Sequence, residues 1–274
     1  MPLTPPLHQH ASFYKFVELD DPEGVAAILR ELTQPLSGLI LVAPEGINGT
    51  VAGSDEGVSA FEQALTHDPR LHDRFAGMVF KRSGGKTAPF ARMKVHCKSE
   101  IVALGVAGVT ATAERDTHVS PQAWRELIAQ DNVVVIDNRN TFEFRLGKFK
   151  NAIDPQVSHF RDFPDYVHAH APDWKAAGQK VAMYCTGGIR CEKTSAWMQS
   201  LGLEVYQLEG GILNYFQTLP DADLDWEGEC FVFDNRIALD THLQETDTTA
   251  EDVYQDTPDD QWRLRRAKRL DAAQ

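Results

Sequence analysis

The chain has 274 residues, of which 42% are hydrophobic and 24% are charged, a globular composition that excludes a disordered or fibrous chain. At about 100–150 residues per domain, this length predicts two domains, each large enough to bury its own core. The formal net charge of −13, taken alone, argues against a nucleic-acid partner.

The acidic charge lies in one segment of the chain. Residues 221–260 contain 14 Asp and Glu side chains and one basic side chain, Arg236, so this segment alone carries a net charge of −13. The other 234 residues contain equal numbers of acidic and basic side chains. The rest of the protein can therefore have a basic surface, and the total charge does not exclude RNA as a partner.

Three absences bear on where the protein works. The N-terminal residues MPLTPPLHQH lack the charged and apolar regions of a signal peptide. The longest apolar runs, at 38–44 and 101–109, are far shorter than the ~20 residues of a membrane span. The four cysteines (Cys97, Cys185, Cys191 and Cys230) form no CxxC pair and no disulfide framework. We therefore expect a cytoplasmic protein that does not contact membranes and has no structural zinc site.

The first part of the chain alternates strand and helix patterns. Asp21-Pro22 and Ser54 predict helices that continue to about Thr33 and Leu65, because Asp and Ser cap helix N-termini and proline favours the first turn. Aromatic, β-branched or apolar runs predict strands at 12–18, 38–43, 49–52, 78–82 and 92–96. This order predicts a ferredoxin-like α+β domain, with two helices on one face of an antiparallel sheet.

Residues 44–50 (PEGINGT) connect two of these predicted strands. The dipeptide Asn48-Gly49 is typical of tight turns, so the simplest interpretation is a turn at this point. A functional loop that faces the catalytic site is the alternative.

The second part of the chain predicts a parallel sheet. A polar linker at 110–118 precedes Ser120-Pro121, which predicts a helix to about Gln130. Short apolar strands at 133–136, 181–184 and 204–208 alternate with helices at 192–200 and 212–218. Such short apolar strands between helices indicate a parallel sheet that is buried on both faces. From about residue 220 an acidic extension follows, which ends in the basic sequence RLRRAKR.

The most informative stretch surrounds Cys185. The cysteine ends a predicted buried strand, and a helix follows the loop; the loop residues are Thr186, Gly187, Gly188, Ile189 and Arg190. Ligands of open α/β sheets bind beyond the carboxyl ends of the strands, and inward backbone N–H groups with a helix N-terminus favour an anion. We therefore predict a reactive thiolate at Cys185. The other three cysteines are expected to be small buried hydrophobes.

Three stretches of the second part resemble rhodaneses. Cysteine-dependent phosphatases use a Cys-x5-Arg loop, whereas Cys185 and Arg190 form the smaller Cys-x4-Arg loop of rhodaneses, whose cysteine carries a persulfide. Residues 133–154, which contain Asp137 and Arg139, resemble the rhodanese segment with an Asp-x-Arg motif. Residues 206–216 (YQLEGGILNYF) resemble its closing segment. In this resemblance Asp137 and Arg139 support the cysteine loop.

Longer motifs resemble the bacterial tRNA uridine hydroxylase family: CTGGIRCEK, PFARMKV, PEGINGTVAG and WEGECFVFDNR. The resemblance implies an α/β protein, with a ferredoxin- or acylphosphatase-like domain at 1–110, a rhodanese-like catalytic domain at 118–220 and an acidic extension at 221–274. It implies an oxidoreductase that uses Cys185 and molecular oxygen to convert the wobble uridine of tRNA to 5-hydroxyuridine. A cysteine-rich tail found in some members is missing, because no cysteine follows Cys230.

The sequence independently allows an RNA ligand. Residues 78–99 contain no acidic residue but carry six cations, Lys81, Arg82, Lys86, Arg92, Lys94 and Lys98. Cations of this kind bind phosphates without sequence preference, so we predict that they contact tRNA. Lys193 and the basic residues at 263–269 are further candidates. The alternative is a solvated basic face with no ligand.

The oxygen chemistry has no counterpart in the motifs. No histidine is followed two residues later by a carboxylate, as in non-haem iron sites, and no GxGxxG sequence is present. No metal or organic cofactor is therefore expected, and the electron donor is not identified. A sulfurtransferase with a persulfide on Cys185, which would use a small sulfur donor, is the alternative activity. A non-catalytic RNA-binding module would leave the cysteine loop unexplained.

Overall fold

The computed structural model describes residues 8–86, 90–109, 111, 117–255 and 258–271. The chain divides into a first unit (Met1–Val102, Phe233–Ile237 and Arg266–Gln274) and a second unit (Ala103–Val232 and Ala238–Arg265). The extension expected at 221–274 is therefore divided between both units, and most of the expected linker lies outside the described residues. No helix in the described ranges is long and apolar enough to cross a membrane.

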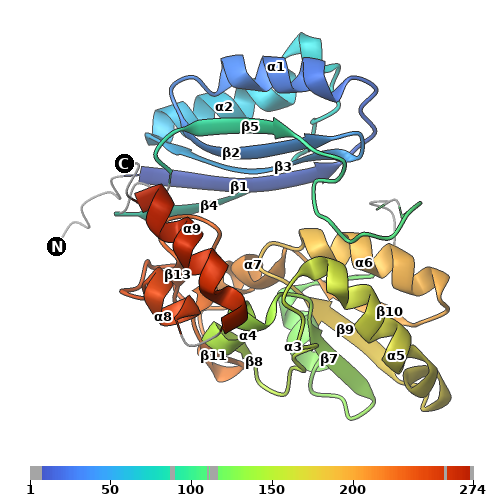
Figure 1. Ribbon diagram of the computed structural model, residues 1–274. Helices are drawn as coiled ribbons and strands as arrows, with labels where there is room; N and C mark the ends of the chain where they lie inside the picture. Colours follow the sequence, from blue (N-terminus) through green and yellow to red (C-terminus); the bar gives the residue numbers. More distant parts are fainter. Residues whose placement is uncertain (1–7, 87–89, 110, 112–116, 256–257, 272–274) are drawn as a thin grey trace. The chain divides into compact units, whose positions relative to one another are not determined.

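The first unit is a sheet with two helices on one face (Figure 1). Its elements are β1 (His8–Phe16), α1 (Pro22–Leu32), β2 (Ser37–Ala43), β3 (Gly46–Gly53), α2 (Asp55–His67), a 3-10 turn (Pro69–Leu71), β4 (Phe80–Gly85) and β5 (Met93–Cys97). The strand order β4-β1-β3-β2-β5 confirms the ferredoxin-like arrangement. The expected antiparallel sheet is wrong at one pair, because β5 returns at the far edge and runs parallel to β2.

The alternation of side chains along the strands builds the core of this unit. Phe13 of β1 and Ile40 of β2 point to the helix side, where they join Leu29 of α1 and Phe61 of α2 in one apolar cluster. Both helices begin where the sequence predicts. Asp21 accepts a hydrogen bond from the backbone N–H of Gly24, and Ser54 accepts one from Gly57, which satisfies N–H groups that the helix leaves free.

The connection between β2 and β3 is shorter than the sequence suggests. The chain turns at Pro44 and Glu45, whereas Asn48 lies within β3 and pairs with strand residues on both sides. The expectation of a turn at Asn48-Gly49 is therefore wrong. Asn48 Nδ2 donates to the carbonyl of Ile101 (3.0 Å), and Glu45 Oε1 accepts from the N–H of Ile101 (2.7 Å). These two side chains fix the chain where the first unit ends.

A short segment from late in the sequence completes the first unit. Asp234 and Arg236, in the segment Phe233–Ile237, form a buried ion pair with a distance of 2.7 Å between Nη2 and Oδ2. Arg236 also donates to Ser83 Oγ (2.8 Å), and Asp234 lies 3.7 Å from the fully buried His10 ring. The late segment thus covers polar groups of β1 and β4.

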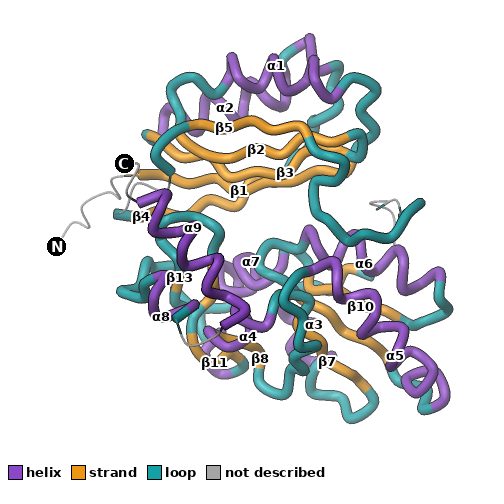
Figure 2. Tube along the Cα trace, in the orientation of Figure 1, coloured by secondary structure: helices purple, strands orange, loops and turns teal. Residues whose placement is uncertain are grey.

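The second unit contains the predicted parallel sheet, with the order β6-β10-β9-β7. Figures 1 and 2 show β10, β9 and β7 of this sheet. Its elements to the end of that layer are β6 (His118–Val119), α3 (Pro121–Leu127), β7 (Val133–Asp137), α4 (Thr141–Leu146), β8 (Gly147–Phe149), a 3-10 turn (Phe160–Asp162), α5 (Phe163–Ala176), β9 (Lys180–Tyr184), α6 (Ile189–Ser200), β10 (Val205–Leu208) and α7 (Gly211–Thr218). Ala182 and Tyr184 of β9 pack with Trp124 of α3 and Ile212 of α7. Both faces of the sheet are buried, as the apolar strands predict.

The acidic extension is folded. It forms a 3-10 turn (Ala222–Leu224), β11 (Trp226–Gly228), β12 (Cys230–Phe231), β13 (Ala238–Leu239), α8 (Ala250–Tyr254), a 3-10 turn (Pro258–Asp260) and α9 (Gln261–Asp271). Trp226 and Cys230 belong to the core of the second unit. Several acids pair with cations: Asp225 binds Arg125 (2.6 Å), and Asp260 binds Arg145 (3.0 Å). Part of the negative charge is therefore neutralised within the fold.

Candidate active site

Cys185 stands at the carboxyl end of β9, between the neighbouring strands β7 and β10. Its side chain is buried, with 1% of its surface exposed. Gly188 has the left-handed conformation (φ 97°) at the start of α6, and its backbone N–H donates to Cys185 Sγ (3.1 Å). The loop therefore closes around the sulfur, as the strand, the two glycines and the helix start predict.

The loop N–H groups can point inward because the carbonyls are held on the other side. The carbonyl of Cys185 accepts from the N–H of Ile212 (3.0 Å), and that of Thr186 accepts from Leu213 (3.1 Å). Gly211 lies so close that a Cβ there would meet the Cys185 carbonyl oxygen at 2.4 Å. The closing LEGGI segment is thus a clamp on the cysteine loop.

Arg190 is held by an acid that the sequence interpretation missed. Its Nη1 and Nη2 atoms lie 3.1 Å and 3.0 Å from the Oε1 and Oε2 atoms of Glu143 on α4. The Glu143 side chain is fully buried and also accepts a hydrogen bond from the backbone N–H of Asn140 (3.1 Å). The Asn-x-x-Glu spacing is a helix-capping signal, but it does not indicate the partner 47 residues later.

The surroundings favour the thiolate form of Cys185. Burial alone raises the pKa of the thiol, but a hydrogen bond from Cys191, the charge of Arg190 and backbone N–H groups outweigh burial and lower the pKa to about 6. Burial and the contact with Cys185 raise the pKa of Cys191 well above its usual range. Cys191 is fully buried, as expected of a small hydrophobe, and in addition its neutral thiol favours the thiolate form of Cys185.

The other two cysteines lie apart from this chemistry. Cys97 donates to the carbonyl of Pro22 (3.6 Å), and burial raises the pKa of its thiol. Cys230 is fully buried in the core of the second unit, and burial raises its pKa to about 12. Neither thiol is activated.

The rate of Cys185 alkylation should therefore depend on pH with a midpoint near 6. Only the thiolate reacts, so the rate should rise about tenfold per pH unit below the midpoint and become constant above it. Iodoacetamide labelling followed by mass spectrometry of the Cys185 and Cys97 peptides measures this, with Cys97 as the internal control. A midpoint near the ordinary thiol value of about 8.5 would contradict the assignment.

The double variant Arg190→Met, Glu143→Gln tests the cause of that pKa. It removes the cation near the sulfur without leaving a buried unpaired carboxylate. We expect the labelling midpoint to move upward, so that labelling at pH 7 slows.

Asp137, at the end of β7, and Arg139 form a fully buried ion pair. Arg139 Nε and Nη2 donate to the Asp137 carboxylate (2.8 Å and 2.6 Å), and Nη2 also donates to the Gly147 carbonyl (2.6 Å). The guanidinium lies against the rings of Tyr184 and Trp226, with distances of 5.6 Å and 5.5 Å to the ring centroids. The pair joins β7 to β8.

The cations that the sequence predicts to contact tRNA have different environments in the structure. Arg82 is bound to Glu62 (2.7 Å) and Asp55 (2.9 Å) of α2, so its charge is already paired. Lys193 is buried, with 1% exposed. These two residues present no free surface charge, so the structure adds no support to their assignment to RNA contacts. Lys81 lies over the Tyr14 ring, 5.0 Å from its centroid.

The remaining grouped cations lie at the surface of the first unit. Lys86 and Lys98 are exposed, whereas Arg92 and Lys94 lie at the edge strand β5. Among the basic residues at 263–269, Arg263 is held within the fold: it donates to the carbonyl of Ser158 (2.6 Å) and forms an ion pair with Asp260.

Comparisons with known proteins agree with this division. Residues 8–101 match the UPF0176 acylphosphatase-like domain, and residues 120–218 match the rhodanese-like domain. A tRNA uridine(34) hydroxylase of Legionella pneumophila (strain Corby) is 44% identical over 253 residues, which cover 91% of this chain and 94% of that protein. Its counterpart in Anaplasma marginale (strain St. Maries) is 45% identical over 236 residues, 85% of this chain and 83% of that protein.

Among solved structures, a rhodanese-related protein from Thermoplasma volcanium is 24% identical and covers 36% of this chain and 90% of its own, with a TM-score of 0.27. The assignment rests instead on the relatives that extend over both units. With identities of 44% and 45% over most of both proteins, this chain belongs to the tRNA uridine(34) hydroxylase family.

Proposed function

We propose that this protein is an oxidoreductase that hydroxylates uridine 34 of tRNA at C5, with Cys185 as the nucleophile and molecular oxygen as co-substrate. The observation that carries the proposal is the loop around Cys185 Sγ, in which the N–H of Gly188 donates to the sulfur and Cys191 and Arg190 lower its pKa, in a chain of this family. A tRNA substrate implies work in the cytoplasm. The reaction also needs a two-electron donor, since uridine, O2, two electrons and two protons give 5-hydroxyuridine and water.

The thiolate supplies what the uracil ring lacks. Attack of Cys185 Sγ on C6 forms an S–C6 bond and moves the C5=C6 electron pair toward C5 and O4. The electron-rich C5 then forms a bond to oxygen from an oxidant produced by two-electron reduction of O2. Loss of the C5 proton and expulsion of the thiolate restore the double bond and free Cys185.

Each neighbour has a defined part in this sequence. Arg190 and the N–H of Gly188 stabilise the thiolate before attack and again when it leaves. Cys191 donates a hydrogen bond to the sulfur, and its high pKa keeps it from competing as a nucleophile. Glu143 is a positioning residue, because it acts on the sulfur through Arg190, which it holds in place.

A persulfide on Cys185 is the alternative form of the nucleophile. An S–S bond of about 2.05 Å would extend the reactive sulfur beyond the buried Sγ, which is 1% exposed. The same species would serve a sulfurtransferase. It would add about 32 Da to the intact protein and would be removed by a thiol reductant.

The decisive test is nucleoside mass spectrometry of tRNA from cells with and without this gene. We expect 5-hydroxyuridine and nucleosides made from it to disappear from position 34 on deletion and to return when the gene is restored. If the levels of these nucleosides are unchanged on deletion and the purified protein transfers sulfur from thiosulfate to cyanide, the protein is a sulfurtransferase and the hydroxylase proposal is rejected.

A further inference from the structure

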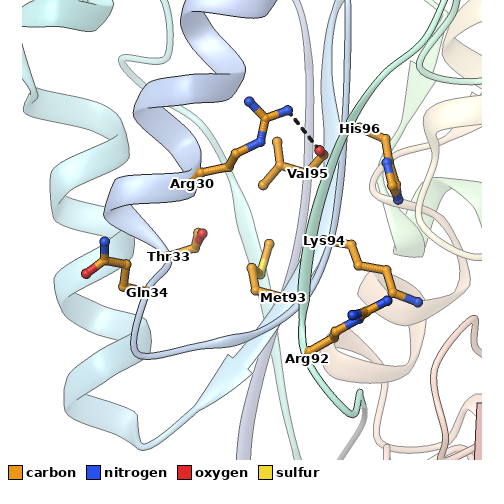
Figure 3. A pocket seen from close by; sticks show the side chains of 8 residues that line it. All are labelled: Arg30, Thr33, Gln34, Arg92, Met93, Lys94, Val95 and His96. Atoms are coloured by element: carbon orange, nitrogen blue, oxygen red, sulfur yellow. Dashed lines mark hydrogen bonds between the residues drawn. The ribbon is translucent and has the colours of Figure 1, made fainter. Parts of the chain in front are cut away.

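A pocket opens at one edge of the first unit, away from the cysteine loop in sequence (Figure 3). It has a volume of about 350 Å³ and lies between the C-terminal end of α1 and the edge strand β5. Its polar lining consists of Arg30, Thr33, Gln34, Arg92, Lys94 and His96. No Asp or Glu is part of the lining, although the chain carries 40 acidic residues. The pocket therefore suits an anion.

The cations of this pocket differ from other arginines of the same unit. Arg70 is bound to Glu31 and Asp68, and Arg82 is bound to Glu62 and Asp55. In contrast, none of the four basic side chains of the pocket makes an ion pair with a carboxylate within the described part of the chain. Their charge is available to a ligand, and like charges gathered without acids are unfavourable until an anion binds.

Arg30 is fixed in place by the sheet edge. Its Nη2 donates to the carbonyl of Val95 (3.2 Å), an outward group of β5, which is an edge strand in the described part of the sheet. This bond leaves other guanidinium N–H groups for a ligand. Arg30 comes from a helix some sixty residues earlier than β5, so the sequence grouping at 78–99 did not include it.

The pocket cations lie on two sides of β5. Figure 3 shows Arg30 with Thr33 and Gln34 on one side of the strand, and Arg92 and Lys94 on the other side. A chain of phosphates that passes over the edge strand can contact the cations on both sides.

We propose that this β5-edge pocket binds phosphate groups of an RNA backbone, with Arg30 and the Arg92–Lys94 pair on different phosphates. That the RNA is tRNA rests on the proposed function. Phosphate contacts of this kind add affinity that is independent of sequence and decreases with salt. The pocket thus contributes sequence-independent affinity for the RNA, and it does not recognise the target uracil base.

The variant Arg92→Gln, Lys94→Gln tests the pocket by filter binding or fluorescence anisotropy of tRNA over a range of salt concentrations. We expect about a tenfold or larger loss of affinity at about 0.1 M salt, and a decrease of about 1 in the slope of log K against log salt for each contact removed. Arg30→Gln should act in the same direction, and Arg30→Lys should retain more affinity because it keeps the charge.

The matched control is Arg70→Gln, Arg74→Gln, which removes the same charge from the same unit at residues near acids. Equal affinities and salt slopes for the two double variants would contradict the proposal that the pocket binds RNA phosphates. Unchanged tRNA binding together with lost binding of inorganic phosphate, measured by calorimetry, would assign the pocket to a small phosphate compound instead. Equal melting temperatures exclude unfolding as the cause.

The same measurements keep this inference apart from the proposed function. If the wild-type protein hydroxylates tRNA and the pocket variant binds tRNA equally well, the proposed role of the pocket is rejected and the hydroxylase proposal stands. If tRNA binding depends on the pocket residues but no hydroxylation is found, the proposed role of the pocket stands and the hydroxylase proposal is rejected.

Discussion

The variant Cys185→Ser should form no measurable 5-hydroxyuridine, a loss of at least about a thousandfold. A serine hydroxyl occupies nearly the same space, but it is not ionised near neutral pH, so neither attack on C6 nor a persulfide is possible. The measurement is the formation of 5-hydroxyuridine in tRNA by the purified variant with an electron donor, or by cells in which it replaces the wild-type gene.

Cys97→Ser is the matched control for this variant. Cys97 is partly exposed, its thiol pKa is raised, and it lies in the first unit, so the same atomic change there should leave hydroxylation unchanged. Hydroxylation by Cys185→Ser at the wild-type rate would contradict the mechanism in which Cys185 is the nucleophile. A lower melting temperature for Cys185→Ser alone would point to a structural role of the thiol.

The variant Gly211→Ala should disable the cysteine loop without any change to Cys185. Its φ of 69° costs about 1 kcal/mol for a residue with a Cβ, and that Cβ would meet the Cys185 and Thr186 carbonyl oxygens at 2.4 Å and 2.7 Å. The loop has to move, so the N–H groups around the sulfur lose their alignment. We expect the labelling midpoint of Cys185 to rise and hydroxylation to fall by about a hundredfold or more.

Gly178→Ala isolates the contribution of the close contact. Gly178 has nearly the same φ (62°), lies in the same unit, and would place its Cβ where nothing lies within 4 Å. This variant should lose about 1 kcal/mol of unfolding free energy and keep both the Cys185 pKa and the activity. Equal effects of the two variants would mean that only backbone strain matters and that the clamp has no role.

Sequence predicts best where the cause is local. The caps at Asp21 and Ser54, the apolar strand β9 and the glycines after Cys185 act within a few residues, and each is found where expected. Helix α5 was not predicted, because Pro164 and Pro172 interrupt its pattern. Proline at the helix start fits the first turn, but an internal proline argues against a helix.

The partners of charged groups could not be predicted in the same way. Arg82 and Arg92 look alike as basic residues of one acid-free stretch, yet only Arg82 meets acids, which α2 brings to it. Glu143 and Arg30 reach the sites of Arg190 and Lys94 only through tertiary packing. Charge density along a chain therefore indicates where cations are frequent and does not reveal which of them remain available.

The late segment around Asp234 and Arg236 has a consequence for biosynthesis. Domains generally fold from the N-terminus while the ribosome is still extending the chain. The first unit cannot cover His10 and Ser83 in this order, because their partners are translated after most of the second unit. The first unit therefore acquires its final packing only after residues 233–237 have been translated.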